Sequence, residues 1–343
     1  MSLPLALAAA TVISLGGSAD TTIAVSRGTT LQIANFAGQV TVKAWDKNAV
    51  RVHTDAPEGD QVLVKEAGGV LLIKAYSRRS EDRSIDLSIV APAWMDLAVS
   101  GIHTDVVIDG TKGRVRVETV HGDIEVAGGR GQIELNAVNQ DIHLVDASGI
   151  VLSETVNGDM TLQRIESDSV DVSTVNGEIF YEGSIRNHGV YRFTSHNGDI
   201  AVALPKSADA MVNVSTFSGE FASDFPVSLT ETRKGRQFCF MLGRGSARVE
   251  LESFQGTIHI FRPGARGPVA NMETPRVRAP EPPKAPKPPK AAKGKREYGG
   301  EQDAEDEEDP EPDADPEDDV PGPGHGHGDE EDLEGHFHNV TRN

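Results

Sequence analysis

The stretch Thr155-Val-Asn-Gly-Asp-Met-Thr-Leu162 decides the fold, because close copies of it recur along the chain at short intervals. The copies differ in detail, but each of the six stronger ones has a small or polar pair followed by an acid and an apolar residue. They begin at Thr119, Ala137, Thr174, Ser195 and Thr216, with weaker copies at Asn35 and Ser253. The central position is occupied by Gly122, Gln140, Gly158, Gly177, Gly198 and Gly219. A spacing of about 18–21 residues indicates that each copy is one structural unit.

Apolar and polar residues alternate on both sides of the central glycine. Val115 and Val117 precede the corner at Gly122, and Ile124 and Val126 follow it. A period of two predicts half-buried β-strands, and the β-branched residues at these positions suit a pleated surface. Asn-Gly tolerates positive φ, so the sequence predicts a tight corner between two strands in every unit.

Two all-β architectures fit this pattern. In the first, each Asn-Gly closes a two-residue hairpin and the chain forms an antiparallel meander. In the second, it is the corner of a single-chain β-solenoid, whose rungs pair strand by strand along the stack. The near-constant spacing favours the solenoid, with rungs of about 18–21 residues. One apolar position per corner is then expected to form an inward-facing column: Val120, Val138, Val156, Val175, His196 and Phe217.

The chain divides into four predicted regions. Residues 1–19 combine an apolar run with Gly17-Ser18-Ala19 and are typical of a secretory signal peptide that is cleaved after Ala19. Residues 20–100 contain irregular β-strands, which we expect to cap the open end of the stack. Residues 101–263 hold the solenoid repeats. No later apolar stretch is long enough for a transmembrane helix, so the protein is expected to be exported, to the periplasm or the cell surface.

The C-terminal region, residues 264–343, has a different composition. It holds 10 basic and 21 acidic residues and 13 of the 19 prolines, and it contributes −11 of the formal net charge of −20. With few apolar groups to offset the entropy of ordering, it is predicted to be disordered. Its first part, around Pro275–Lys295, is rich in Pro, Lys and Ala and favours an extended polyproline spacer.

The overall acidity argues against a nucleic-acid partner, because phosphate contacts need Lys and Arg. The single cysteine, Cys239, excludes an intrachain disulfide framework. Since it lies between Phe238 and Phe240, it is interpreted as a small buried apolar residue rather than a nucleophile.

The repeats resemble those of the DUF4097 family of bacterial candidate adhesins, which carry the same T-V-N-G-D-I core. The resemblance extends over roughly residues 20–263. Gln140 in place of glycine and the long tail depart from the family pattern. The resemblance implies an exported β-helical protein of the cell envelope or surface, without defined catalytic residues.

The acid that follows each corner is the one feature of the repeat that could carry chemistry, such as binding a cation. In a solenoid these carboxylates would lie about 4.8 Å apart and would repel one another. Calcium, which prefers oxygen ligands, could neutralise them; otherwise each acid is solvated and caps the turn backbone. The column consists of Asp123, Asp141, Asp159, Glu178, Asp199 and Glu220. No other cofactor is indicated.

A second metal hypothesis concerns the tail, where four histidines lie among acids: His325, His327, His336 and His338. Neither a nucleophile elbow, nor a zinc-protease motif, nor a P-loop is present. The prediction is therefore a protein that is not an enzyme, an adhesin-like binding or scaffold module whose partners are envelope or surface macromolecules, either polysaccharide or protein. The alternatives are a periplasmic stress-associated accessory protein and a β-helical carbohydrate-active enzyme. The oligomeric state stays open.

Overall fold

The computed structural model describes residues 11–56, 59–76, 84–225 and 236–263. Every regular element in these ranges is a β-strand, which confirms the all-β prediction. A search of the described residues for helices long and apolar enough to cross a membrane finds none. The tail region from residue 264 onwards, with its four histidines, lies outside the described residues.

Twenty-two strands follow one another in this part of the chain. The first eleven are β1 (Thr11–Gly16), β2 (Ser18–Ala24), β3 (Thr30–Trp45), β4 (Ala49–Asp55), β5 (Gln61–Ala67), β6 (Val70–Tyr76), β7 (Leu87–Pro92), β8 (Asp96–Thr111), β9 (Val115–Glu118), β10 (Ile124–Gly128) and β11 (Arg130–Asn136). The others are β12 (Ile142–Val145), β13 (Ser148–Asn157), β14 (Met160–Asn176), β15 (Ile179–Gly183), β16 (Val190–Asn197), β17 (Ile200–Ala203), β18 (Ala210–Thr216), β19 (Phe221–Ser223), β20 (Arg236–Leu242), β21 (Ala247–Gln255) and β22 (Ile258–Phe261).

Successive repeats pair in parallel and in register. Val151 of β13 lies opposite Val170 of β14, and Val170 lies opposite Tyr191 of β16. On the other side of the corner, Ile124 of β10 lies opposite Ile142 of β12. The Asn-Gly corners therefore do not close hairpins, and the meander alternative is wrong. The pairing is the rung-to-rung pattern that the solenoid alternative predicts.

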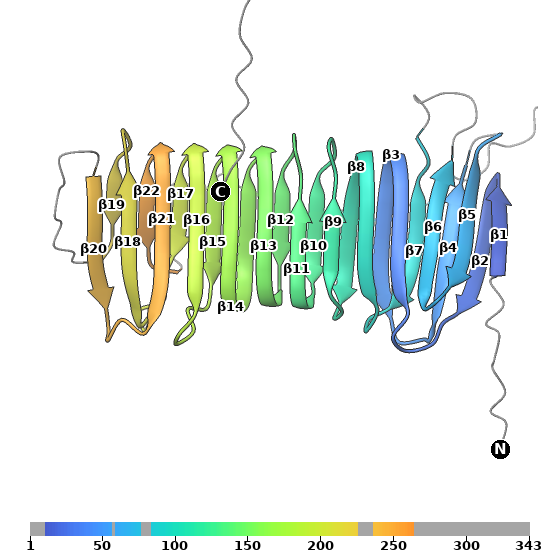
Figure 1. Cartoon of the computed structure of the whole chain (residues 1–343), viewed down its shortest axis with the longest axis horizontal. Helices are drawn as coiled ribbons and strands as arrows, with labels where there is room; N and C mark the ends of the chain where they lie inside the picture. Colours follow the sequence, from blue (N-terminus) through green and yellow to red (C-terminus); the bar gives the residue numbers. More distant parts are fainter. Residues whose placement is uncertain (1–10, 57–58, 77–83, 226–235, 264–343) are drawn as a thin grey trace, which may run out of the picture. The chain divides into compact units, whose positions relative to one another are not determined.

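The strands form two layers, one on each side of the corners (Figure 1). The first layer contains, in spatial order, β1, β5, β6, the first half of β3, the first half of β8, β9, β11, β13, the second half of β14, β16, β21, β18 and β20. The second layer contains, in spatial order, β2, β4, β7, the second half of β3, the second half of β8, β10, β12, the first half of β14, β15, β17, β22 and β19. Alternate side chains of both layers meet in one apolar core.

Spatial order departs from chain order at two places. β21 and β22, which carry the weak copy at Ser253, lie between β16/β17 and β18/β19. The copy that begins at Thr216 is therefore the last of these rungs in space, although the copy that begins at Ser253 follows it in sequence. Near the N-terminus β3 pairs along its length with β8, so the weak copy at Asn35 is itself a rung of the stack.

Antiparallel strands lie at both ends of the parallel stack. At the N-terminal end β5 pairs with β6 and β1, and β4 pairs with β7 and β2. At the other end β20 pairs with β18. Residues 11–19, predicted to belong to a signal peptide, form β1 and the start of β2. Asp20, the first residue after the predicted cleavage point, forms an ion pair with Arg51 of β4.

The predicted positive φ occurs at Gly38 and Gly256, but three other corner glycines serve a different purpose. Positive φ is not the reason at Gly158, Gly177 and Gly198, where φ lies outside the left-handed region. There the backbones of neighbouring rungs approach so closely that a side chain does not fit. A Cβ on Gly177 would lie 1.9 Å from the carbonyl oxygen of Gly158, far inside van der Waals contact.

A buried hydroxyl supports each of these close approaches. The side chain of Thr174 donates a hydrogen bond to the carbonyl oxygen of Gly158 at 3.3 Å, and Ser195 does the same to Gly177 at 3.1 Å. Satisfying a buried carbonyl avoids the free-energy cost of leaving it unpaired. The Thr or Ser that opens each repeat is thus structural.

Candidate functional site

The corner acids form the column that the sequence predicts, and most of them are used by the backbone. Carboxylate oxygens of Asp105, Asp123 and Asp141 accept the backbone N–H of the acid on the next rung, at distances of 2.8–3.3 Å. Asp159 accepts the N–H of Glu178 at 2.8 Å, and Asp199 accepts that of Thr257 at 2.6 Å. These hydrogen bonds join neighbouring rungs, so each acid caps the corner of the next rung and not, as the alternative to calcium predicts, its own turn.

Two acids of this column lie where the charged form of a carboxyl group is disfavoured. Burial raises the pKa of Asp123, repulsion from Asp141 and Asp105 adds to the effect, and the N–H of Asp141 opposes it. Burial also raises the pKa of Glu178, together with repulsion from Asp159 and Asp199. In the described ranges no group of three or more His, Cys, Asp or Glu side chains is placed to hold a metal ion. The calcium column stays a prediction.

The apolar corner residues point outward, so the prediction of an inward column is wrong. We call these exposed residues the apolar column; its apolar members are 36–63% exposed. The alternation that buries Val117 and Thr119 places Val120 on the outer side. In spatial order the apolar column consists of Ile102, Val120, Val138, Val156, Val175, His196, Phe254 and Phe217.

Aromatic rings stack at the C-terminal end of the apolar column. The Phe254 ring lies 4.7 Å from those of His196 and Phe217, nearly parallel to both. Beside the column runs a row of amides, in which the side chain of Asn157 donates to Asn139 at 2.8 Å and that of Asn176 donates to Asn157 at 2.7 Å. The corner edge thus presents apolar, amide and carboxylate rows side by side.

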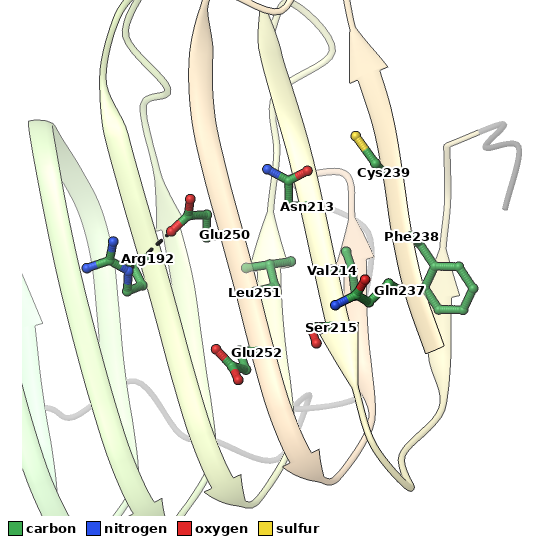
Figure 2. Close-up of a pocket in the computed structure, with 10 residues that line it drawn as sticks. All are labelled: Arg192, Asn213, Val214, Ser215, Gln237, Phe238, Cys239, Glu250, Leu251 and Glu252. Atoms are coloured by element: carbon green, nitrogen blue, oxygen red, sulfur yellow. Dashed lines mark hydrogen bonds and ion pairs between the residues drawn. The ribbon is translucent and has the colours of Figure 1, made fainter. Parts of the chain in front are cut away.

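A polar groove lies on the outer surface of the first layer, across β16, β21, β18 and β20 (Figure 2). Its volume is about 540 Å³, which is within the range of small-molecule sites. The strands alternate, so Val214, Leu251 and Phe238 turn their side chains to the core. The outward side chains that line it are Arg192, Asn213, Ser215, Gln237, Cys239, Glu250 and Glu252.

The shape of the groove follows from side-chain size. On β18 the outward residues Asn213 and Ser215 are short, so this strand forms the floor. Longer side chains rise on each side, with Glu250 and Glu252 on β21 and Gln237 on β20 (Figure 2).

An ion-pair network fixes one wall of the groove. Arg192 donates to Glu250 at 3.2 Å and to Asp171 at 3.1 Å. The hydrogen bond to Glu250 is the main reason that the pKa of Arg192 is raised. Exposed ion pairs of this kind contribute little to stability, but they hold the charged groups in defined positions. The remaining lining offers amide, hydroxyl and carboxylate groups, which together can donate and accept hydrogen bonds.

Cys239 is exposed in this groove, so the prediction of a buried cysteine is wrong. Its neighbours Phe238 and Phe240 are buried, and alternation along β20 turns the residue between them outward. In Figure 2 the Phe238 ring lies away from the Cys239 side chain. None of the lining residues is a histidine, so the groove does not pair the thiol with an imidazole base.

A smaller pocket of about 340 Å³ lies on the second layer. Two corner acids, Glu178 and Asp199, line it together with Thr257 and His259. Asp199 is already hydrogen-bonded to the backbone of Thr257. The groove on the first layer has more polar side chains in its lining and is the better candidate for ligand binding.

Comparison with known proteins supports the resemblance that the repeats predict. Residues 145–261 match the family model described as Toastrack DUF4097. A candidate cell adhesion protein from Clostridium sporogenes is 11% identical, with a TM-score of 0.24, over 71% of this chain and 99% of that chain. A candidate adhesin from Parabacteroides merdae is 11% identical, with a TM-score of 0.30, over 71% of this chain and 96% of that chain. Comparison with curated proteins gives no match.

Proposed function

We propose that this chain, which matches the Toastrack DUF4097 family over residues 145–261, is a non-enzymatic binding module of the cell envelope or cell surface. Its ligand is a polysaccharide, held in the groove across β16, β21, β18 and β20. The observation that carries the proposal is the groove lining, where Asn213, Ser215 and Gln237 lie beside the charged wall of Arg192 and Glu250.

The chemistry of the lining fits a polyhydroxylated ligand. Sugar hydroxyls donate and accept hydrogen bonds at the same time, and amides, hydroxyls and carboxylates match both roles. Arg192, Glu250 and Glu252 leave the lining with a formal charge of only −1, which does not select a strongly charged ligand. Because the groove lies open on the outer surface of the layer, it can hold part of a long chain.

The arrangement gives little support to the enzyme alternative. Hydrolysis of a glycosidic bond needs one carboxylic acid to give up a proton and a second carboxylate opposite it. Glu250 is already bound to Arg192 and lies 3.9 Å from Arg248, while Glu252 is on the same strand and exposed. The two glutamates therefore stand on one side of the groove instead of facing each other across it.

The test is oligosaccharide binding by the full-length chain. An array of neutral hexose and N-acetylhexosamine oligomers would identify a ligand, and calorimetry would then measure its affinity. The variant Asn213→Leu/Gln237→Leu should weaken binding at least about tenfold, which corresponds to losing one or two hydrogen bonds. Gln163→Leu, on the outer surface of the second layer, is the matched control and should bind normally.

Two results would count against the proposal. Absence of binding to every oligomer on the array, or equal binding by the groove variant, would reject the groove as a polysaccharide site. Release of new reducing ends from a bound oligomer would instead show that the chain is an enzyme.

A further inference from the structure

The last strand of the first layer, β20, has a neighbouring strand on one side only (Figure 1). It pairs with β18 over its whole length, Arg236–Leu242, in a regular antiparallel register without a bulge. Within the residues that the structure describes, no strand pairs with its other side. An unpaired strand edge presents backbone N–H and C=O groups that can bind another strand.

The backbone hydrogen bonds of β18 determine which groups of β20 are free. Asp209 and Phe217, which flank β18, both bond to β21, at 2.9 Å and 3.3 Å. Hydrogen-bonding direction alternates along a strand, so Asn213, midway between them, also bonds to β21 and not to β20. Because Asn213 lies opposite Cys239, these two form a pair without hydrogen bonds, and the N–H and C=O of Cys239 point away from β18.

The same alternation turns the backbone groups of Gln237 and Met241 to the free side, together with those of Cys239. The side chains of these three residues are exposed on the outer surface, whereas Phe238 and Phe240 face the core and are 4% and 9% exposed. Natural edge strands commonly carry a lysine, a proline or a bulge that prevents pairing. After its first residue β20 has no charged residue, no proline and no bulge, so its edge is open to pairing.

A second copy of β20 fits this edge. Cys239 is the midpoint of the strand, so antiparallel pairing about a twofold axis at Cys239 overlaps both strands over their whole length. Cys239 then faces Cys239 of the second copy, Gln237 faces Met241, and each pair of free residues exchanges two hydrogen bonds. With a formal net charge of −20, two copies of this chain repel each other in general. Since β20 contains no acid, two copies can approach there.

We propose that two copies of this chain associate through β20, antiparallel about Cys239, so that their first layers join in one continuous sheet. Main-chain hydrogen bonds supply the affinity, and Phe238 of one copy lies opposite Phe240 of the other on the core side of the sheet. The twofold axis is perpendicular to the layer, so the polar grooves of both copies lie on the same face. The association does not depend on what binds in the grooves.

Analytical ultracentrifugation of the full-length chain tests the association, and should show a monomer–dimer equilibrium that depends on protein concentration. Cys239→Pro removes the free N–H at the centre of the edge and keeps the bonds to β18, and proline is tolerated in edge strands. It should raise the dissociation constant of the dimer at least about tenfold, because both hydrogen bonds of the central pair are lost. The matched control Cys239→Ser keeps the N–H and should associate normally. Circular dichroism verifies that both variants are folded.

Thiol cross-linking tests the register of the two strands. In a Cys239→Ser background, chains with Gln237→Cys and chains with Met241→Cys are mixed and oxidised with diamide, which accepts the two electrons and two protons of the thiols. Opposite residues of a hydrogen-bonded pair have Cα atoms ~5.5 Å apart, which suits a disulfide, so the mixed pair should cross-link. Two Gln237→Cys chains should not, because their thiols are about 14 Å apart along the strands.

Several outcomes would overturn the proposal. A monomer at every concentration would show that the edge does not bind a second copy. A dimer that Cys239→Pro leaves unchanged would assign the contact to another surface. Cross-linking of two Gln237→Cys chains as readily as of the mixed pair would reject the register about Cys239. Loss of the dimer in Cys239→Pro without cross-linking of the mixed pair would mean that β20 binds a different strand of the second copy.

Discussion

Each residue of the Thr-Val-Asn-Gly-Asp corner has a separate physical task. Thr174 fills a buried position and donates to Gly158, while Val175 is exposed. The side chain of Asn176 donates to the amide oxygen of Asn157 on the previous rung. The backbone N–H of Glu178 donates to the carboxylate of Asp159, which fixes the position of Glu178. The glycine between them is there because a neighbouring carbonyl occupies the space of a side chain.

The glycine can be tested by substitution. Gly177→Ala places a Cβ 1.9 Å from the Gly158 carbonyl oxygen, so the rungs must move apart. We expect a loss of about 3 kcal/mol or more in the free energy of unfolding, measured by urea denaturation. The control is Gln140→Ala, at the equivalent position that already carries a side chain, and it should change stability by less than ~0.5 kcal/mol. Similar losses in both variants would disprove the steric explanation.

The residue scale also shows where sequence reasoning succeeded and failed. The alternation of apolar and polar residues along each strand places the core residues correctly. Extended as far as the corner, it also places Val120 on the outer surface. Hydrophobicity alone predicts an inward Val120, whereas its position in the alternation predicts the exposed side chain that the structure has. The same holds for Cys239, because the buried Phe238 and Phe240 on each side imply an outward side chain.

At the scale of strands and corners, stacking identical corners brings like charges together. Asp123 and Glu178 have raised pKa values because they are partly buried and lie beside other acids. A carboxyl whose pKa is higher in the folded chain stabilises the fold fully below its unfolded pKa. That contribution is lost as the pH rises through the folded value. At neutral pH the ionised carboxylates of Asp123 and Glu178 therefore destabilise the stack.

Asp123→Asn should raise the melting temperature by about 1–3 °C at pH 7–8. The amide oxygen can still accept the N–H of Asp141, but the charge is gone. The gain should disappear near pH 3, where the carboxyl is also neutral. Melting curves recorded from pH 3 to pH 8 provide the measurement.

Asp146→Asn is the matched control for this pH dependence. The hydrogen bond from Arg164 lowers the pKa of Asp146, so its stabilising effect is present above the unfolded pKa and is lost as the pH falls. The same substitution should therefore slightly lower the melting temperature at pH 7–8, and this loss should shrink as the pH falls below 4. A change of the same sign in both variants would contradict the electrostatic account of the column.

Strand positions were predictable from alternation, whereas their order in space was not. The rung of β21 and β22 lies between two rungs that precede it in sequence. All rungs share the same pattern of inward apolar residues, so any of them could be a neighbour of any other. The groove was also beyond prediction, because it needs the short side chains of β18 to lie between the longer ones of β21 and β20.

At the scale of the whole described unit, the parallel stack has antiparallel strands at both ends and different chemistry on its surfaces. The outer surface of the first layer carries the polar groove, and the corner edge carries the apolar column with its acids. The groove and the corner edge both result from the in-register stacking of successive repeats, which also places the corner valines side by side on the outside.

Disulfide trapping tests that claim most directly. In a Cys239→Ser background, Val138→Cys/Val156→Cys places two exposed thiols on adjacent rungs, ~4.8 Å apart along the stack. That separation is suitable for a disulfide, whereas the ~9.6 Å of Val138→Cys/Val175→Cys is not. The account predicts rapid intramolecular oxidation of the first pair in the folded protein and none of the second. Equal oxidation of both pairs, or failure of the first, would contradict it.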